Sequence, residues 1–378
     1  MTTQDHPTGA PGEAGTALGC VRRTSVRGLP GGRGVTIGSG HFAPIQLAAW
    51  REVRGAHICG LVSSDEPDRL RALAEQFDLP CYGGDFEAVA EACGADFVDI
   101  VTPPATHGDY IRRAADLGLP ILCQKPLAPT VAEAEELVRY AAERGVPLLV
   151  NENWRWQPWY REAARLIRAG VIGRPFHSTF RMRPGDGWGP VPYPEQPYFA
   201  RMERFLLLET GVHYVDTTRF LLGEIGRVTC VTGRVNQAIA GEDLALAVLG
   251  LSDGGTVLYD ADRCAYADPV RSAVYGTMTI EGEEGNLLLA DDGTLRIQRR
   301  DGVDTDHGYD IPGGWKGGCA VAAQQHAVEV FQGLVEPETP GDDYLRTMQI
   351  IEACYLSAEQ RRTVDVGPSP VTVSGGAR

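Results

Sequence analysis

Hydrophobic residues in the first part of the chain fall into short runs separated by longer amphipathic stretches. The runs predict strands at Gly34–Gly38, Ala56–Val62, Phe97–Val101, Pro120–Cys123 and Pro147–Val150. The amphipathic stretches predict helices at Phe42–Trp50, Pro67–Phe77, His107–Leu117 and Val131–Arg144. Strands that alternate with helices in this way form βαβ units. This part therefore predicts an α/β fold with a doubly wound parallel sheet of the Rossmann type.

Short strands of alternating hydrophobicity dominate the chain from Phe176 to Ile311. They are expected at Arg227–Val235, Leu244–Leu251, Thr256–Ala261, Met278–Glu281, Asn286–Leu289 and Leu295–Gln298. An aromatic helical stretch precedes them, one helix interrupts them and two close the chain, at Asn151–Ile167, Gly211–Leu222, Cys319–Leu334 and Asp343–Glu359. The pattern predicts an α+β domain with a large, open, mostly antiparallel sheet.

Composition and charge narrow the possible functions. The formal net charge of −15 disfavours binding to nucleic acid or an anionic membrane through a basic surface. The nine cysteines form no C-x-x-C pair, so they are expected to be reduced thiols of a cytoplasmic protein. The apolar runs are too short to span a membrane. No histidines stand four residues apart and the cysteines do not cluster, so no metal site is predicted.

A glycine-rich segment, Gly38–Ala43, follows the first predicted strand and opens a helix. Its sequence G-S-G-H-F-A fits G-x-G-x-x-G/A, in which the glycines let the backbone approach a pyrophosphate at the helix N-terminus. A glycine-rich turn without a ligand is the alternative. The residues expected at the dinucleotide are Gly38, Gly40, His41, Phe42 and Ala43.

The end of the second predicted strand, Ser63-Ser64-Asp65, gives a mixed signal on NAD against NADP. An acidic residue there binds the ribose 2′-hydroxyl and repels a 2′-phosphate. Ser64 takes the acidic position, which leaves room for a phosphate, but Asp65 follows and no basic residue appears before Arg69. The balance favours NAD over NADP.

The segmentation that follows is a flexible tail (1–32), a dinucleotide-binding Rossmann domain (33–151), a substrate-binding α+β domain (152–362) and a C-terminal strand and tail (363–378). The tail at the beginning is rich in Gly, Pro and Thr and has no apolar core of a signal peptide.

Five further motifs occur in order along the chain. They read T-P-P-A-T-H, Q-K-P, N-W-R-W-Q-P, G-V-H-Y-V-D and R-F-L-L-G-E, at Thr102–His107, Gln124–Pro126, Asn153–Pro158, Gly211–Asp216 and Arg219–Glu224. Together with the glycine loop they resemble the glucose–fructose oxidoreductase and inositol dehydrogenase family (Gfo/Idh/MocA). The resemblance implies NAD(P)-dependent oxidation or reduction of secondary alcohols on sugars, cyclitols and related compounds.

The resemblance also implies roles for single residues. Thr102, Pro103, His107 and Gln124 would lie beside the nicotinamide half of the cofactor, and Lys125 and His213 would be catalytic. Glu209 stands where the family usually has a catalytic Asp, and Gln124 replaces the glutamate of its E-K-P motif. The substrate would meet Lys125 and His213.

The chemistry agrees with these residue types. Oxidising an alcohol requires a base for the hydroxyl proton, and His213 suits this role because histidine titrates near neutrality. Lys125 is either a second candidate base or a clamp for the developing alkoxide. Glu209 lies four residues before His213, so a helix would bring them together. The structural alternatives are a His213–Asp216 pair and a Glu209 that only complements the helix dipole.

Other polar residues divide between binding and structural roles. Asn153, Arg155, Trp156 and Arg181 are candidates for binding substrate. The aromatic run Trp154–Tyr160 fits core packing better than sugar stacking, and Arg183, Asp186 and Trp188 fit a solvated loop as well as a hydroxyl-binding one. Asp216 and Arg219 are expected to form a structural pair.

The function expected is therefore hydride transfer between NAD(P) and a CH–OH group of a sugar or cyclitol, in a homo-oligomer. Two alternatives stay open. One is a glycosidase or lyase that oxidises its sugar transiently with a retained NAD. The other is a non-catalytic dinucleotide sensor, which is suggested by the departures from the family motifs at Gln124 and Glu209.

Overall fold

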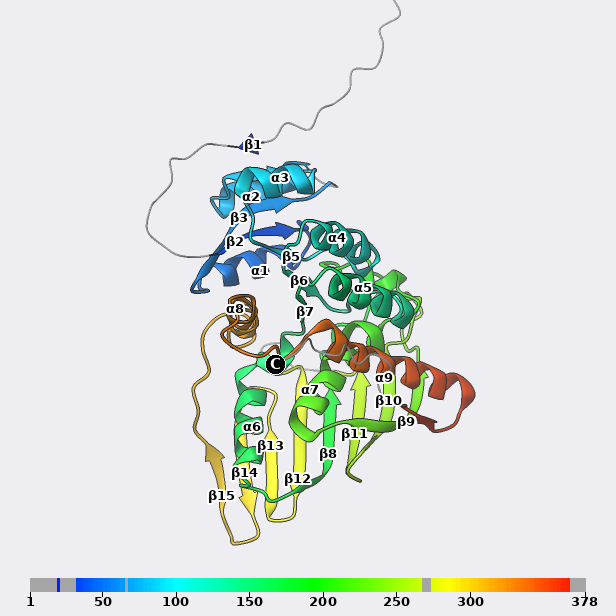
Figure 1. Cartoon of the computed structure of the whole chain (residues 1–378). Helices are drawn as coiled ribbons and strands as arrows, with labels where there is room; N and C mark the ends of the chain where they lie inside the picture. The colour runs from blue at the N-terminus through cyan, green and yellow to red at the C-terminus, as the bar shows by residue number, and fades with distance from the viewer. Residues whose placement is uncertain (1–18, 21–31, 65–66, 267–272, 368–378) are drawn as a thin grey trace, which may run out of the picture.

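The computed structural model describes residues 19–20, 32–64, 67–266 and 273–367. Within them the chain forms two sheets, and Figure 1 shows one above the other. Most of the predicted tail 1–32, Asp65 and the last residues of the chain lie outside this description.

The first sheet is a Rossmann sheet in the order β1-β4-β3-β2-β5-β6-β7. All neighbours pair in parallel except the short β1, which is antiparallel to β4. Its strands are β1 (Gly19–Cys20), β2 (Gly32–Ile37), β3 (Ala56–Val62), β4 (Cys81–Gly83), β5 (Phe97–Ile100), β6 (Ile121–Gln124) and β7 (Leu148–Asn151). The helices between them are α1 (Ala43–Trp50), α2 (Pro67–Gln76), α3 (Phe86–Cys93), α4 (Pro104–Asp116) and α5 (Val131–Glu143).

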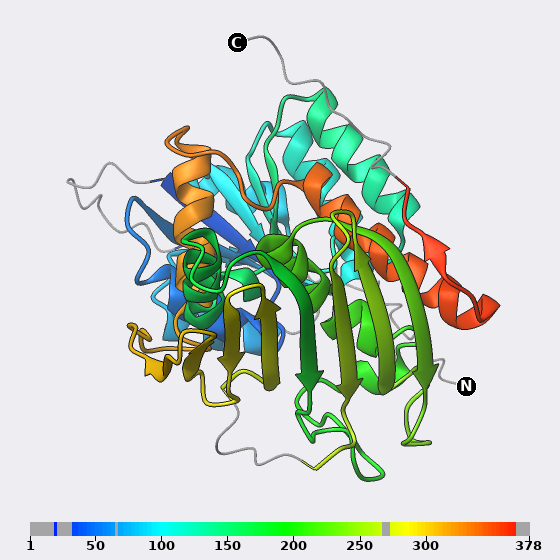
Figure 2. The same cartoon turned by 90° about the horizontal axis from the view of Figure 1, so that it is seen from below.

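The second sheet has the order β15-β14-β13-β12-β8-β11-β10-β9-β16 and is antiparallel except where β8 meets β11. Figure 2 shows its strands side by side as one layer. They are β8 (Pro175–Met182), β9 (Ile225–Gly233), β10 (Leu244–Leu251), β11 (Thr256–Asp262), β12 (Gly276–Gly282), β13 (Gly285–Leu289), β14 (Leu295–Arg299), β15 (Asp304–His307) and β16 (Val364–Asp365). The predicted fold class is confirmed.

Helical segments cover one face of the second sheet, whereas the other face is open. Along β10, Ala245 and Ala247 are buried, while Leu246 and Val248 between them are 43% and 42% exposed. The covering elements are η1 (Trp154–Trp156), α6 (Pro158–Arg168), the π-helical turn η3 (Leu206–Gly211) and α7 (Val212–Leu222). The short η2 (Phe199–Arg201) belongs to a separate aromatic cluster with Tyr193 and Phe205. The alternation in sequence thus separates a core face from an open face.

Helices α8 (Cys319–Phe331) and α9 (Gly341–Gln360) join the two parts of the molecule (Figure 1). Although α8 lies within the predicted range 152–362, it packs against the first sheet, where Ala327 and Val328 share a core cluster with Trp50. In α9, Tyr344 belongs to the core of the first sheet and Ile350 to that of the second. Helix α9 therefore packs against both sheets and connects them.

Several elements were not among the predicted ranges, including β1, β4, β8, β15, η2 and α3. β4 is three residues long, and β15 (D-T-D-H) has no hydrophobic residue to signal a strand. α3 begins at Asp85, whose carboxylate accepts from Ala88 N at 3.0 Å, and ends at Gly94 in the left-handed conformation (φ 59°). This capping pattern was present in the sequence and is the signal that was missed.

Candidate active site

The glycine loop has the shape that a dinucleotide requires. Gly38 has φ +119°, and a Cβ there would lie 2.9 Å from the backbone of Val101. A Cβ at Gly40 would meet nothing within 4 Å, so this part of the loop faces open space. Helix α1 starts at Ala43, directly after His41 and Phe42. The backbone of this loop and the N-terminus of α1 thus leave room for a pyrophosphate at the place expected from the sequence.

Buried polar atoms at the carboxyl ends of the next strands fit the same ligand. Among the described residues, Thr102 Oγ1, Gln124 Nε2 and both amide atoms of Asn151 have no hydrogen-bond partner. Gln124 and Asn151 are register partners at the ends of β6 and β7. Buried polar groups are normally hydrogen-bonded, so these atoms suit a polar ligand such as the nicotinamide half of NAD.

At the end of β3 the two sequence candidates are Ser63 and Ser64, since Asp65 lies outside the described residues. Ser63 accepts a hydrogen bond from Ser39 of the glycine loop at 2.8 Å between the two Oγ atoms. This contact joins the loop to the strand end where the adenine ribose is expected.

His107 lies behind these loops instead of facing a ligand. Its ring is fully buried, with Nε2 2.7 Å from Thr102 O and Nδ1 3.2 Å from Leu127 O. Burial lowers the pKa of His107 against the effect of these carbonyls. The residue therefore connects the loops that follow β5 and β6, which corrects the predicted contact with the cofactor. Pro103 precedes α4 as its N-cap.

Lys125 and Glu209 meet across the boundary between the two sheets. Lys125 follows β6, and its Nζ donates to the Glu209 carbonyl oxygen at 2.6 Å and to its Oε1 at 2.7 Å. Burial would raise the pKa of Glu209, but the charges of Lys125 and Arg263 and the hydrogen bonds from Lys125 and Thr210 lower it to about 2. Glu209 is thus an ionised carboxylate that fixes Lys125.

His213 is held from behind by Glu152, a residue that was not predicted from the sequence. The ring Nδ1 contacts Glu152 Oε1, and Glu152 is completely buried. An ionised carboxylate can only accept, so Nδ1 carries the proton and Nε2 keeps the lone pair in the neutral ring. Trp154 stacks on the imidazole with 4.5 Å between ring centroids.

The pKa of His213 is lowered from its ordinary value. Burial is the largest cause, and the charge of Lys125 adds to it, while Glu152 and Glu209 act in the opposite direction. Desolvation of the buried ring outweighs the effect of the two carboxylates. His213 is therefore a neutral base near pH 7, close enough to Lys125 and Glu209 to sense both charges.

Comparisons with known proteins place this geometry in a family. A profile described as "Oxidoreductase family, NAD-binding Rossmann fold" (Gfo/Idh/MocA) matches residues 33–152, and the Gfo/Idh/MocA C-terminal domain matches 160–287. The chain belongs to the Gfo/Idh/MocA oxidoreductases.

Two relatives and one solved structure of this family illustrate the similarity. The chain is 36% identical over 367 residues to D-apiose dehydrogenase of Paraburkholderia graminis, which covers 91% of this chain and 94% of that protein. It is 31% identical over 249 residues to scyllo-inositol 2-dehydrogenase (NAD(+)) of Bacillus subtilis, over 63% of this chain and 67% of that one. An oxidoreductase from Agrobacterium radiobacter, in complex with NAD+, L-tartaric acid and magnesium, matches with a TM-score of 0.82 and 33% identity over 89% of this chain and 98% of that chain.

The Gfo/Idh/MocA assignment confirms the predicted activity class. The chain is an NAD(P)-dependent dehydrogenase acting on CH–OH groups, with an NAD-binding Rossmann domain. In the part of the chain that the structure describes, no helix is long and apolar enough to cross a membrane. The same residues contain no group of three or more His, Cys, Asp or Glu side chains that could hold a metal ion.

Arg155 has a structural position in this Gfo/Idh/MocA chain. Its guanidinium donates to both carboxylate oxygens of Asp216, at 2.7 and 2.6 Å, and to Glu338 O at 2.7 Å. Asp216 therefore pairs with Arg155, and Arg219 pairs with Glu224 and Asp343. The predicted Asp216–Arg219 pair was wrong, because the tertiary fold supplies each residue with another partner.

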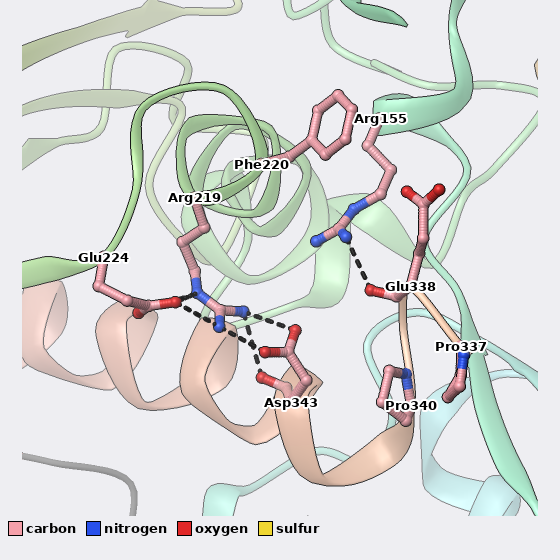
Figure 3. A pocket seen from close by; sticks show the side chains of 8 residues that line it. All are labelled: Arg155, Arg219, Phe220, Glu224, Pro337, Glu338, Pro340 and Asp343. Carbon is pink, nitrogen blue, oxygen red and sulfur yellow. Dashed lines mark hydrogen bonds and ion pairs between the residues drawn. The ribbon is translucent and has the colours of Figure 1, made fainter. Parts of the chain in front are cut away.

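Figure 3 shows a pocket beside Arg155 and the ion pairs of Arg219. Its volume is about 240 Å³. It is lined by Arg155, Arg219, Phe220, Glu224, Pro337, Glu338, Pro340 and Asp343. The pocket contains none of Lys125, Glu209 and His213. Arg219 is paired with two carboxylates of the pocket, Glu224 and Asp343, and Arg155 is paired with Asp216 outside it. The pocket lies between α7 and the start of α9.

The remaining substrate candidates lie in different places. Asn153 is buried with an Oδ1 that has no partner among the described residues, so it can still meet a ligand. Trp156 packs on His326 of α8, with ring centroids 4.7 Å apart. Arg181 is on the open face of the second sheet, with its side chain 62% exposed and 4.0 Å from Asp260. This position corrects its predicted contact with substrate.

Proposed function

We propose that this chain oxidises a small sugar with NAD as hydride acceptor, and that Lys125, Glu209 and His213 are its catalytic residues. The observation that carries the proposal is the Lys125–Glu209 ion pair at 2.7 Å, next to a His213 whose tautomer is fixed by Glu152. A cation and a neutral base at one place are what deprotonation of an alcohol requires.

The three catalytic residues have different roles in this proposal. His213 Nε2 takes the hydroxyl proton, because Nδ1–H is directed to Glu152. Lys125 stabilises the negative charge that develops on the substrate oxygen. Glu209, with a pKa of about 2, stays ionised and holds Lys125 without acting as the base. NAD, when bound, accepts the hydride from the carbinol carbon.

The relatives point to the sugar. The similarity to D-apiose dehydrogenase extends over 91% of this chain, and supports D-apiose or a related small aldose as the substrate. Gly38, Gly40 and Ala43 would hold the pyrophosphate of NAD, and Thr102, Gln124 and Asn151 its nicotinamide half.

Assembly and location complete the proposal. The exposed Val231, Leu246 and Val248 on the second sheet support a homo-oligomer that covers this face. The eight cysteines from Cys59 to Cys354 are buried thiols outside any disulfide, which fits the reducing cytoplasm.

The test is a panel of sugars and cyclitols, including D-apiose, D-xylose and scyllo-inositol, assayed for formation of reduced nicotinamide with NAD and NADP. We expect turnover of a small aldose with NAD. Lys125→Met should lower kcat by on the order of 10² or more while the dinucleotide still binds. Dinucleotide binding by the wild type without turnover of any compound would favour a sensor and contradict the proposal.

A further inference from the structure

Arg263 is a buried cation beside the proposed catalytic residues. It directly follows β11 and continues the inward-facing series of Val257, Tyr259 and Ala261. Its side chain is only 8% exposed. The guanidinium carbon lies 4.9 to 5.4 Å from the ring centroids of three aromatic residues, Tyr193, Phe199 and Phe205. Burying a charge in this way requires that its hydrogen bonds be satisfied.

The two edges of the guanidinium have different partners. Asp186 accepts from Nε at 3.1 Å and from one terminal nitrogen at 2.6 Å. The other terminal nitrogen lies 3.0 Å from Thr210 Oγ1 and 3.4 Å from Glu209 Oε2. Glu209 thus lies between two cations, with Lys125 at Oε1 and Arg263 at Oε2. Since these contacts occupy the guanidinium, Arg263 acts on Glu209 and not on the substrate.

We propose that Arg263 is a positioning residue that keeps Glu209 ionised and turned toward Lys125. The inference rests on the proposed function, which makes Glu209 and Lys125 catalytic. A purely structural arginine would need only the Asp186 pair; the second edge, directed at Glu209 and its neighbour Thr210, is what links Arg263 to the reaction. An ion pair that fixes one carboxylate oxygen leaves the other in a single orientation for Lys125.

Arg263 and Lys125 together lower the pKa of Glu209. The titratable groups around Glu209 are Lys125, Arg263, His213 and the phenols Tyr198, Tyr259 and Tyr275. The phenols are neutral at working pH because burial raises their pKa values. Without Arg263, burial, the Lys125 cation and the hydrogen bond from Thr210 remain. Because one of the two positive charges is lost, the pKa of Glu209 must rise and its carboxyl takes up a proton at higher pH.

The experiment compares Arg263→Met with Arg263→Lys, which keeps the charge, in the full-length protein. The carboxyl ¹³C signal of Glu209, assigned by its loss in Glu209→Gln, is followed from about pH 4 to 8 in the absence of cofactor. In the wild type it should stay in the ionised position throughout. In Arg263→Met its midpoint should move into this range, and Arg263→Lys should restore most of the ionised form.

Kinetics provide the second readout. Arg263→Met should lower kcat about 10- to 100-fold and leave KM within about threefold, because orientation of Lys125 is lost while binding is not. Arg219→Met removes an equally buried arginine whose partners are Glu224 and Asp343, and should change neither the Glu209 signal nor the pH profile. Arg263→Gln, which keeps hydrogen-bonding capacity toward Asp186, replaces the Met variant if that variant does not fold.

The inference would be overturned if Glu209 stayed ionised down to the same pH in Arg263→Met and Arg263→Gln as in the wild type. It would also be overturned if Arg219→Met shifted the Glu209 signal equally. A shifted Glu209 signal in a protein whose wild type oxidises no sugar would support the Arg263–Glu209 pairing and contradict the proposed function.

Discussion

Replacing Glu152 by Gln tests how the fold prepares His213 as a base. Gln keeps the size of the side chain and an oxygen that can accept from His213 Nδ1–H, so the tautomer is retained. What is lost is the negative charge that raises the pKa of His213 against burial. A hydrogen bond to a charged group contributes about 1 to 2 kcal/mol more than one to a neutral group. This difference corresponds to about one pKa unit.

The expected result is therefore a shift of the pH profile toward acid. His213 must be neutral to accept the hydroxyl proton, so kcat/KM for oxidation falls as the pH drops through its pKa. In the wild type this limb should lie below pH 6.5, the ordinary value of histidine. In Glu152→Gln it should move about one pH unit lower, and kcat on the plateau should fall about three- to tenfold because the base is weaker.

The assay is initial-rate formation of reduced nicotinamide from about pH 4.5 to 8.5 with the substrate found in the panel. Tyr344→Phe is the matched control, because it removes the hydroxyl 3.5 Å from the other Glu152 oxygen and keeps the charge. Its acid limb should coincide with that of the wild type. An unmoved limb in Glu152→Gln, or a limb at higher pH, would refute the role of Glu152 as the carboxylate behind His213.

Three further predictions concern stability, the open sheet face and the cofactor. Burial raises the pKa of Asp99 to about 7 against hydrogen bonds from Trp50 and Gln46. This folded value lies above the unfolded one. The contribution of Asp99 to the free energy of unfolding is therefore complete below about pH 4 and is lost as the pH rises through 7. Asp99→Asn should then be more stable at pH 8, by up to about 4 kcal/mol, and equal near pH 4 in thermal unfolding; a pH-independent difference would contradict this. Arg181→Ala should leave kcat and KM within about twofold, because Arg181 is on the open face; a large rise in KM would return it to the substrate site. Finally, kcat/KM should be higher with NAD than with NADP, and Asp65→Ala should narrow the gap; a strong NADP preference that the substitution does not change would show that Asp65 faces away from the ribose.

The sequence predicted the fold well where periodicity and spacing determine it. The buried strands β5 and β6 are short apolar runs, and the alternating β10 has the predicted bounds Leu244–Leu251. Motif order predicts Lys125, Glu209 and His213 as catalytic residues, and this stays a prediction. That Lys125 and Glu209, 84 residues apart, form an ion pair follows only from the packing of one sheet above the other.

The supporting residues of the site could not be predicted in the same way. Glu152 follows a buried strand between two asparagines, and Arg263 continues the inward-facing positions of β11. A charge at a core-facing position is a signal of a buried ion pair, but its partner is fixed only by the tertiary fold. For the same reason Arg155, Trp156 and Arg181 looked like cleft residues in the sequence, although their contacts are with Asp216, with His326 and with Asp260 on the open face.

The central claim is net hydride transfer from a sugar carbon to NAD, and isotope transfer measures it directly. The sugar that the panel identifies is labelled with deuterium at the carbon that is oxidised, and the products are analysed by mass spectrometry after complete conversion. The account predicts one reduced nicotinamide per oxidised sugar, with the deuterium on the nicotinamide ring. Sugar product formed without net reduced nicotinamide would indicate transient oxidation, as in an NAD-dependent glycosidase or lyase, and would contradict the account.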